Sequence, residues 1–125
     1  MNTQKTQRLL LVDDSRVARL TLTHLLKQTG LSFEIDEAAN ADEALVQFSR
    51  QDYDLALVDF NMPGMNGVEL AEQMLKQKPH LKILLVTANI QESIQERAAR
   101  LGLGFVGKPA SPEELLTAIK GCWYD

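Results

Sequence analysis

Three short stretches of the chain consist entirely of apolar residues. They span residues 9–12, 55–58 and 83–86, and each is followed by a polar residue. Apolar runs of this length are typical of strands buried on both faces, as in a parallel sheet covered by helices. Residues 33–35 alternate between apolar and polar, which predicts a strand nearer the edge of the sheet, and residues 103–106 form a short fifth candidate.

Helix-length segments with an apolar residue at every third or fourth position separate these strands. The five segments are traced by Val17, Leu20, His24, Leu25 and Leu26, by Ala41, Leu45 and Phe48, by Val68, Leu70, Ala71, Met74 and Leu75, by Ile94, Ala98 and Leu101, and by Leu115, Leu116 and Ile119. Each apolar stripe is expected to face the sheet, and His24 is expected to be partly buried among its apolar neighbours.

Residues that favour helix starts precede four of these segments. Asn40, Asn66, Asn89 and Ser111 each stand three residues before a glutamate, which is the spacing of an N-cap with its capping box. Strand and helix thus alternate five times, which predicts an α/β fold with a doubly wound parallel sheet. The 125 residues suffice for one domain, in which residues 1–7 are expected to form a loose N-terminal tail.

The composition narrows the classes of function. The net charge is −4 and no block of like charges occurs, so neither nucleic acid nor a membrane surface is expected as a direct partner. Cys122 is the single cysteine, so no internal disulfide is expected, and no apolar run is long enough to cross a bilayer. These features favour a cytoplasmic protein.

Five polar or charged residues follow the predicted strands. Asp13 and Asp14 follow the first run, Asp59 the second and Thr87 the third, and Lys108 follows the short fifth candidate strand. In open α/β sheets, ligands bind beyond the carboxyl ends of the strands, so these side chains are expected to converge. One aspartate at a strand end is ordinary turn chemistry, but such a set at four strand ends favours a functional site.

Three converging carboxylates repel one another unless a cation offsets their charge. Each close pair costs on the order of a few kcal/mol at an effective dielectric of about 20. Carboxylate oxygens suit Mg²⁺, which keeps positions free for phosphate oxygens. Lys108 would add a mobile positive charge and Thr87 a hydroxyl donor, so the set as a whole predicts phosphoryl chemistry.

Residues 10–15, 57–67, 86–88 and 107–109 resemble the four motif blocks of bacterial response-regulator receiver domains. The resemblance covers residues 8–123 in the right order and spacing. It implies a flavodoxin-like sheet of five parallel strands in the order 2-1-3-4-5 with five helices. It also implies a signalling switch, which catalyses its own phosphorylation and dephosphorylation and is not a turnover enzyme on an external substrate.

The resemblance assigns a role to each residue of the predicted site. Asp59 is implied as the phosphoacceptor. Asp14, Asp59 and the backbone carbonyl of Asn61 are implied as direct ligands of Mg²⁺, with Mn²⁺ as an alternative ion, and Asp13 as a ligand through water. Lys108 is implied to contact the phosphoryl oxygens. No other cofactor is expected.

The resemblance also implies a switch formed by Thr87 and Phe105. Many members carry tyrosine at the second position, and Phe105 lacks its hydroxyl, so simple core packing is the alternative role. The family usually holds the bond corresponding to Lys108–Pro109 in the cis form. Asn61 and Asn89 match positions that tune the lifetime of the phosphoryl group, although Asn89 is interpreted mainly as a helix cap.

The implied phosphodonor is a histidine kinase or a phosphotransfer protein, with small acyl phosphates as further donors. The output partner is a downstream protein or a fused effector domain, and the expected oligomeric state is a monomer or a weak phosphorylation-dependent dimer. A degenerate receiver that acts only by binding other proteins remains the alternative. A haloacid-dehalogenase-type phosphatase would need a second carboxylate at Asn61, and a flavin-binding module would need a phosphate loop in place of Asp13 and Asp14.

Overall fold

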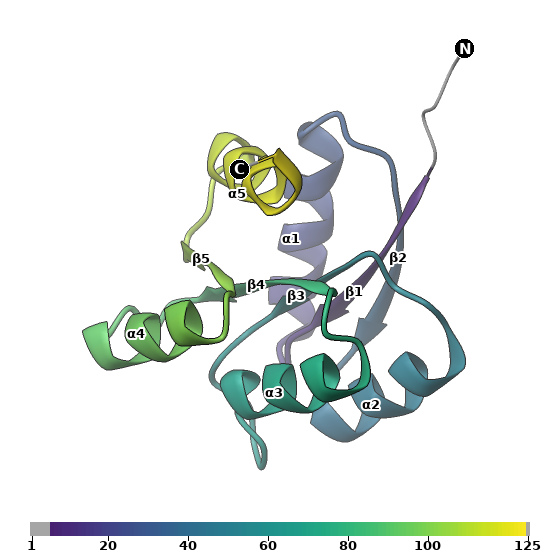
Figure 1. The fold of residues 1–125 in the computed structure, drawn as a ribbon. Coiled ribbons are helices and arrows are strands. Elements are labelled where there is room, and N and C mark those ends of the chain that lie inside the picture. Colours follow the sequence, from purple (N-terminus) through teal and green to yellow (C-terminus); the bar gives the residue numbers. More distant parts are fainter. Residues whose placement is uncertain (1–5, 125) are drawn as a thin grey trace.

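Five strands and five helices alternate along the computed structural model, which describes residues 6–124 (Figure 1). The elements are β1 (Gln7–Val12), α1 (Arg16–Gln28), β2 (Phe33–Ala38), α2 (Ala41–Arg50), β3 (Leu55–Val58), α3 (Gly67–Gln77), β4 (Lys82–Thr87), α4 (Glu92–Arg100), β5 (Gly104–Gly107) and α5 (Pro112–Tyr124). Residues 1–5 of the expected tail lie outside the described residues, whereas Gln7 already pairs with Phe33 in the sheet. None of the described helices is both long and apolar enough for a membrane span.

The strands form one parallel sheet in the order β2-β1-β3-β4-β5. This confirms the implied strand order and the position of β2 at an edge. Val12 lies opposite both Ala38 of β2 and Val58 of β3, so these three strands end at the same level. The chain runs from β1 to β2 on one side and then crosses back past β1 to β3 on the other, so the point where strand order reverses lies at the ends of β1 and β3, beside Val12.

Two apolar layers hold the sheet between its helices, with α1 and α5 on one face and α2, α3 and α4 on the other (Figure 1). Leu9 and Leu11 of β1 pack toward α1 and α5, and Leu10 and Val12 pack toward the opposite layer. All four side chains are fully buried, as the uninterrupted apolar run predicts. Burial of each such leucine stabilises the fold by about 1.5–3 kcal/mol relative to an exposed position.

The capping predictions are confirmed at three of the four positions. The side chains of Asn40, Asn66 and Ser111 each accept a hydrogen bond from the backbone N–H three residues further on. Asn89 does not cap α4, which begins at Glu92. Its side chain instead accepts from the N–H of Gln91, two residues further on, and this local turn competes with the helical cap.

The predicted apolar face of α1 is confirmed for Leu25 and Leu26 and wrong for Val17, Leu20 and His24. Val17 is 72% exposed and Leu20 57% exposed, and His24 lies at the surface as well. The buried residues of this helix are Leu22 and Leu26, which pack between the sheet and α5. Apolar residues lie on both flanks of α1, so periodicity alone did not show which flank faces the core.

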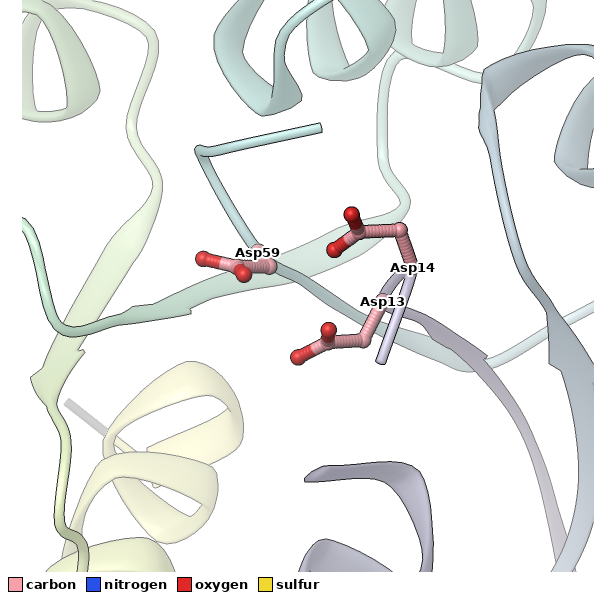
Figure 2. Close-up of side chains that lie close together, drawn as sticks. All are labelled: Asp13, Asp14 and Asp59. Atoms are coloured by element: carbon pink, nitrogen blue, oxygen red, sulfur yellow. The ribbon is translucent and has the colours of Figure 1, made fainter. Parts of the chain in front are cut away.

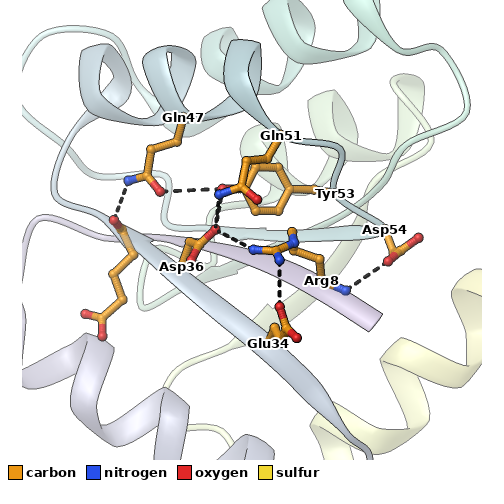
Figure 3. Close-up of polar contacts among 8 residues, drawn as sticks. Arg8, Glu34, Asp36, Gln47, Gln51, Tyr53 and Asp54 are labelled. Atoms are coloured by element: carbon orange, nitrogen blue, oxygen red, sulfur yellow. Dashed lines mark hydrogen bonds and ion pairs between the residues drawn. The ribbon is translucent and has the colours of Figure 1, made fainter. Parts of the chain in front are cut away.

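A polar network links β1, β2 and the segment before β3 (Figure 3). The Arg8 guanidinium donates to Glu34 at 2.6 Å and to Asp36 at 3.3 Å, and the backbone N–H of Arg8 donates to Asp54 at 2.8 Å. The buried hydroxyl of Tyr53 donates to the same Asp36 oxygen at 2.7 Å. The network satisfies the buried phenol and fixes the start of β1 against β2.

Candidate functional site

The loop after β1 contains only three residues, and hydrogen bonds hold the first and the last of them. The N–H of Asp13 donates to the carbonyl of Ala38, which extends the β1–β2 pairing by one step. The N–H of Ser15 donates to Asp13 Oδ1 at 2.9 Å, and Ser15 Oγ caps α1 by accepting from Ala18 N–H at 3.1 Å. The loop therefore presents Asp13 and Asp14 in a defined orientation above the sheet.

Asp59 follows β3 and continues its pairing with β1, because its N–H donates to the carbonyl of Val12 at 3.0 Å. The start of α3 packs directly against it. A Cβ atom added to Gly67 would lie 2.2 Å from the carbonyl oxygen of Asp59, so only glycine fits this first residue of α3. This positioning role was missed from the sequence, although a glycine directly after the capping Asn66 is the signal that could have indicated it.

The three aspartates meet at the carboxyl edge of the sheet (Figure 2). One carboxylate oxygen from each of Asp13, Asp14 and Asp59 lies within 4.8 Å of the other two. Asp13 is 1% exposed and Asp59 9% exposed, whereas Asp14 is open to solvent. At this separation, each pair of ionised carboxylates repels by about 3–4 kcal/mol at an effective dielectric of about 20.

Lys108 brings a positive charge to this acidic cluster from the end of β5. Its Nζ lies 2.6 Å from Asp13 Oδ2 and 3.5 Å from Asp59 Oδ2. The backbone N–H of Lys108 donates to the carbonyl of Thr87, and the bond to Pro109 is cis, as the resemblance implies. One lysine offsets one of three carboxylates, so a net negative charge of two remains for a divalent cation to offset.

The donor set of the acidic cluster fits Mg²⁺. All its side-chain ligand atoms are carboxylate oxygens, which Mg²⁺ prefers, and no sulfur or imidazole lies among them. The exposed side of the cluster at Asp14 leaves room for water and for phosphate oxygens, which this ion keeps in its coordination shell. Mg²⁺ binding would also relieve the repulsion between the carboxylates.

Thr87, Asn61 and Asn89 form the rim of the site. The fully buried Thr87 accepts a hydrogen bond from the N–H of Asn89 through its Oγ1, at 3.2 Å. The side-chain amide of Asn89 donates to Asn61 Oδ1 at 3.5 Å, and the Asn61 N–H donates to Asp59 Oδ1 at 3.4 Å. A chain of contacts therefore connects the end of β4 with Asp59.

Phe105 lies apart from the acidic cluster. It sits in β5 opposite Leu85, two positions before the pairing of Thr87 with Gly107, and its half-buried ring packs against the core beside α4. The structure thus brings together Asp13, Asp14, Asp59 and Lys108. Thr87 and Asn61 lie at the rim of this cluster, and Phe105 lies outside it.

The sequence matches the response regulator receiver domain family over residues 9–120. The chain is 33% identical to the transcriptional regulatory protein ResD of Bacillus subtilis over 119 residues, which are 94% of this chain and 48% of ResD. It is 30% identical to the chemotaxis protein CheY of Thermotoga maritima over 115 residues, covering 90% of this chain and 94% of CheY. The crystal structure of the response regulator TrrA from Thermotoga maritima, in complex with Mg²⁺ and BeF, superposes with a TM-score of 0.83 at 34% identity, covering 94% of this chain and 99% of TrrA.

This protein belongs to the response regulator receiver domain family. It is a receiver of two-component systems, and receiver domains are signalling proteins rather than turnover enzymes on external substrates. The family uses Mg²⁺, and its members interact with histidine kinases and phosphotransfer proteins. The chain spans about half the length of several curated relatives, including 48% of ResD and 53% of the activator ExaE of Pseudomonas putida.

Proposed function

We propose that Asp59 accepts a phosphoryl group in a Mg²⁺-dependent reaction and that the resulting acyl phosphate changes the binding of partner proteins. The observation that carries this proposal is the position of Asp59. Its carboxylate is nine-tenths buried, lies within 4.8 Å of Asp13 and Asp14, and has the ammonium group of Lys108 at 3.5 Å. A carboxylate is a weak nucleophile, so positioning and charge neutralisation must supply most of the rate acceleration.

We assign Asp14, Asp59 and the backbone carbonyl of Asn61 as the groups that hold Mg²⁺ directly, and Asp13 as a ligand through water. Mn²⁺, which accepts the same oxygen ligands, is assigned as an alternative ion. The bound ion supplies neutralisation of charge on the phosphoryl oxygens. The buried position of Asp13 supports its indirect role, because its carboxylate oxygens already accept from Ser15 N–H and from Lys108.

In the proposed transfer, a carboxylate oxygen of Asp59 forms a bond to phosphorus as the bond from phosphorus to the donor nitrogen breaks. Lys108 moves from Asp13 to an oxygen of the transferred group. The Thr87 hydroxyl donates a hydrogen bond to the same group. This is consistent with its present bond, in which the oxygen accepts from Asn89 and the hydroxyl hydrogen stays available. Hydrolysis of the acyl phosphate ends the signal.

Movement of Thr87 toward the phosphoryl group is the proposed start of the switch. Thr87 and Phe105 lie on the adjacent strands β4 and β5, and the ring of Phe105 is only half buried. A shift of the fully buried Thr87 would open space that the Phe105 ring can enter. Phe105 has no hydroxyl, so the proposed change depends on packing alone.

The proposed donor is a histidine kinase or a phosphotransfer protein that presents a phosphohistidine. Such a donor must approach over Asp59, and the neighbouring surface is apolar. A groove of about 330 Å³ lies between α1 and the segment after β5, lined by Ala18, Thr21, Leu22, Leu25, Ala88, Lys108, Pro109 and Ala110. Together with the exposed Val17 and Leu20, this groove suits an apolar helix face of the donor.

We assign the chain to the cytoplasm, since its single cysteine leaves no internal disulfide to form. We further propose that it works as a monomer or as a weak phosphorylation-dependent dimer, coupled to a downstream protein or to an effector domain. These assignments follow the family and the composition.

Incubation with Mg²⁺ and acetyl phosphate, followed by intact-mass measurement, tests the phosphoacceptor. One added phosphoryl group is expected, and it should be absent in EDTA and in Asp59→Asn. A gain that persists in Asp59→Asn would assign the acceptor to another residue. No gain in the wild-type protein, together with no change of Mg²⁺ affinity on addition of beryllofluoride, would favour a degenerate receiver that acts only by binding other proteins.

A further inference from the structure

Arg19 joins the loop that carries the acidic cluster to the neighbouring strand. Its Nη1 donates to the backbone carbonyl of Asp13 at 2.6 Å, and its Nε donates to Glu37 Oε1 at 2.7 Å. The Arg19 side chain is 14% exposed, whereas that of Glu37 is 42% exposed. The guanidinium therefore lies beneath the loop rather than in solvent, with one edge directed at the backbone and the other held by Glu37.

The carbonyl of Asp13 belongs to the peptide group that joins Asp13 to Asp14. On the other side of Asp13, its N–H is fixed by the carbonyl of Ala38. With Arg19 in place, both backbone groups of Asp13 are bonded, so the peptide plane that leads into Asp14 is fixed. Asp14 itself is exposed, and its side chain makes no hydrogen bond or ion pair with the described residues. The direction of its carboxylate therefore depends on this backbone.

We propose that Arg19 is a positioning residue for the metal site, which holds Asp14 at the angle needed to bind Mg²⁺, and that Glu37 aims the guanidinium. The proposal rests on the proposed function of the acidic cluster. Residues that orient metal ligands from outside the coordination sphere typically change metal affinity by about 10–100-fold when they are replaced.

The two contacts need arginine and not merely a positive charge. Nε and Nη1 bond to two acceptors at once, and the planar guanidinium fixes the angle between the two bonds. Lysine has one nitrogen on a flexible stem and cannot reproduce this geometry. The positive charge of Arg19 by itself would weaken Mg²⁺ binding, because a nearby cation repels Mg²⁺. A variant without the charge would bind Mg²⁺ more tightly if electrostatics were the main effect.

The test is calorimetric titration of the unphosphorylated protein with Mg²⁺ alone. Arg19→Lys, which keeps the charge, and Arg19→Leu, which removes it, should each weaken Mg²⁺ binding by about tenfold. Glu37→Gln keeps an acceptor for Nε and should stay within about twofold of the wild-type protein, whereas Glu37→Ala should weaken binding. Arg16→Lys is the matched control, since Arg16 is an exposed residue of the same helix without a polar contact to the described residues.

Thermal unfolding in EDTA shows whether each variant is folded at the titration temperature. Amide hydrogen exchange of residues 13–15 without metal adds a second readout, and it should be faster in Arg19→Lys than in Arg16→Lys. Unchanged Mg²⁺ affinity and unchanged exchange in Arg19→Lys, or tighter binding in Arg19→Leu, would overturn the proposal. A wild-type protein that does not bind Mg²⁺ would instead overturn the proposed function on which it rests.

Discussion

Lys108 and Asp13 form an ion pair of 2.6 Å across the carboxyl edge of the sheet, although they lie 95 residues apart in the chain. Asp13 is almost fully buried, and within the described residues Lys108 is the one cation that pairs with its carboxylate. In this state the lysine offsets charge within the acidic cluster. The ion pair therefore opposes Mg²⁺ binding and stabilises the protein when no metal is bound.

Lys108→Met is accordingly expected to lower the stability of the metal-free protein and to raise its affinity for Mg²⁺. Without metal, the loss of the partner of a buried carboxylate should lower the free energy of unfolding by about 3 kcal/mol. Mg²⁺ should bind about tenfold more tightly, because it no longer competes with the ammonium group. Phosphorylation by acetyl phosphate should slow by about 100-fold or more, since a group that stabilises the transferred phosphoryl is gone. Urea unfolding in EDTA, calorimetry and intact-mass kinetics measure the three effects, and weaker Mg²⁺ binding would contradict the competition.

Asp59→Asn should stabilise the metal-free protein. The substitution removes repulsion from two carboxylates and loses one attraction, to Lys108 at 3.5 Å, so a net gain of about 1–2 kcal/mol is expected. Urea unfolding in EDTA measures this gain, with Glu96→Gln as an exposed control that removes one negative charge from α4. A stability equal to that of the wild-type protein would contradict a net repulsion of Asp59 by the other two carboxylates.

Gly67→Ala should destabilise the protein by about 1–3 kcal/mol, because the new Cβ would lie 2.2 Å from the backbone oxygen of Asp59. The strain acts on the chain that carries Asp59, so Mg²⁺ affinity should fall as well. Gly121→Ala is the control. It lies in α5 with no atom within 4 Å of the added Cβ, and alanine there should be neutral or stabilising by up to about 1 kcal/mol. Equal stability of the two variants would contradict the close approach.

Stability above about pH 10 should depend on Tyr53. Burial, together with the hydrogen bond to Asp36 and the charge of Asp36, raises the pKa of Tyr53 well above its ordinary value of 10.0. Above pH 10 the folded protein thus keeps a proton that the unfolded chain releases. The contribution of Tyr53 to the free energy of unfolding is therefore complete below pH 10 and is lost as the pH rises further.

Tyr53→Phe should cost about 1 kcal/mol at neutral pH through the lost hydrogen bond to Asp36. Its free energy of unfolding should then approach that of the wild-type protein as the pH rises from about 10 to 11, because only the wild-type protein loses the contribution of Tyr53. Urea unfolding across that range checks the convergence. A constant difference between the two proteins would show that the phenol titrates alike in the folded and unfolded states.

The convergence of Asp13, Asp59 and Lys108 could be predicted from the sequence because it depends on topology alone. Asp13 and Asp59 directly follow the buried ends of β1 and β3, which end level, and Lys108 directly follows the parallel strand β5, so all three lie at one edge of the sheet. Which flank of α1 is exposed could not be predicted in this way. Val17 and Leu20 form an apolar pair at helical spacing on one flank, and the buried Leu22 and Leu26 form another on the opposite flank. Only packing against α5 decides between the two flanks.

Arg19 escaped sequence analysis for a related reason. Its two acceptors are a backbone carbonyl and a glutamate 18 residues away in β2, and no local pattern marks either as a partner. Asn89 was misinterpreted because its spacing from Glu92 imitates a capping box. In the structure the competing turn to Gln91 and the contact with Asn61 take its side chain instead.

The ion pair between Asp13 and Lys108 also sets an order of events during translation. Asp13 leaves the ribosome with the first strand, and Lys108 follows 95 residues later, on the order of 5–20 s at ordinary elongation rates. Until the fifth strand docks, the three aspartates have no lysine to accompany them. We therefore expect the proposed phosphoacceptor site to become complete only once β5 has joined the sheet.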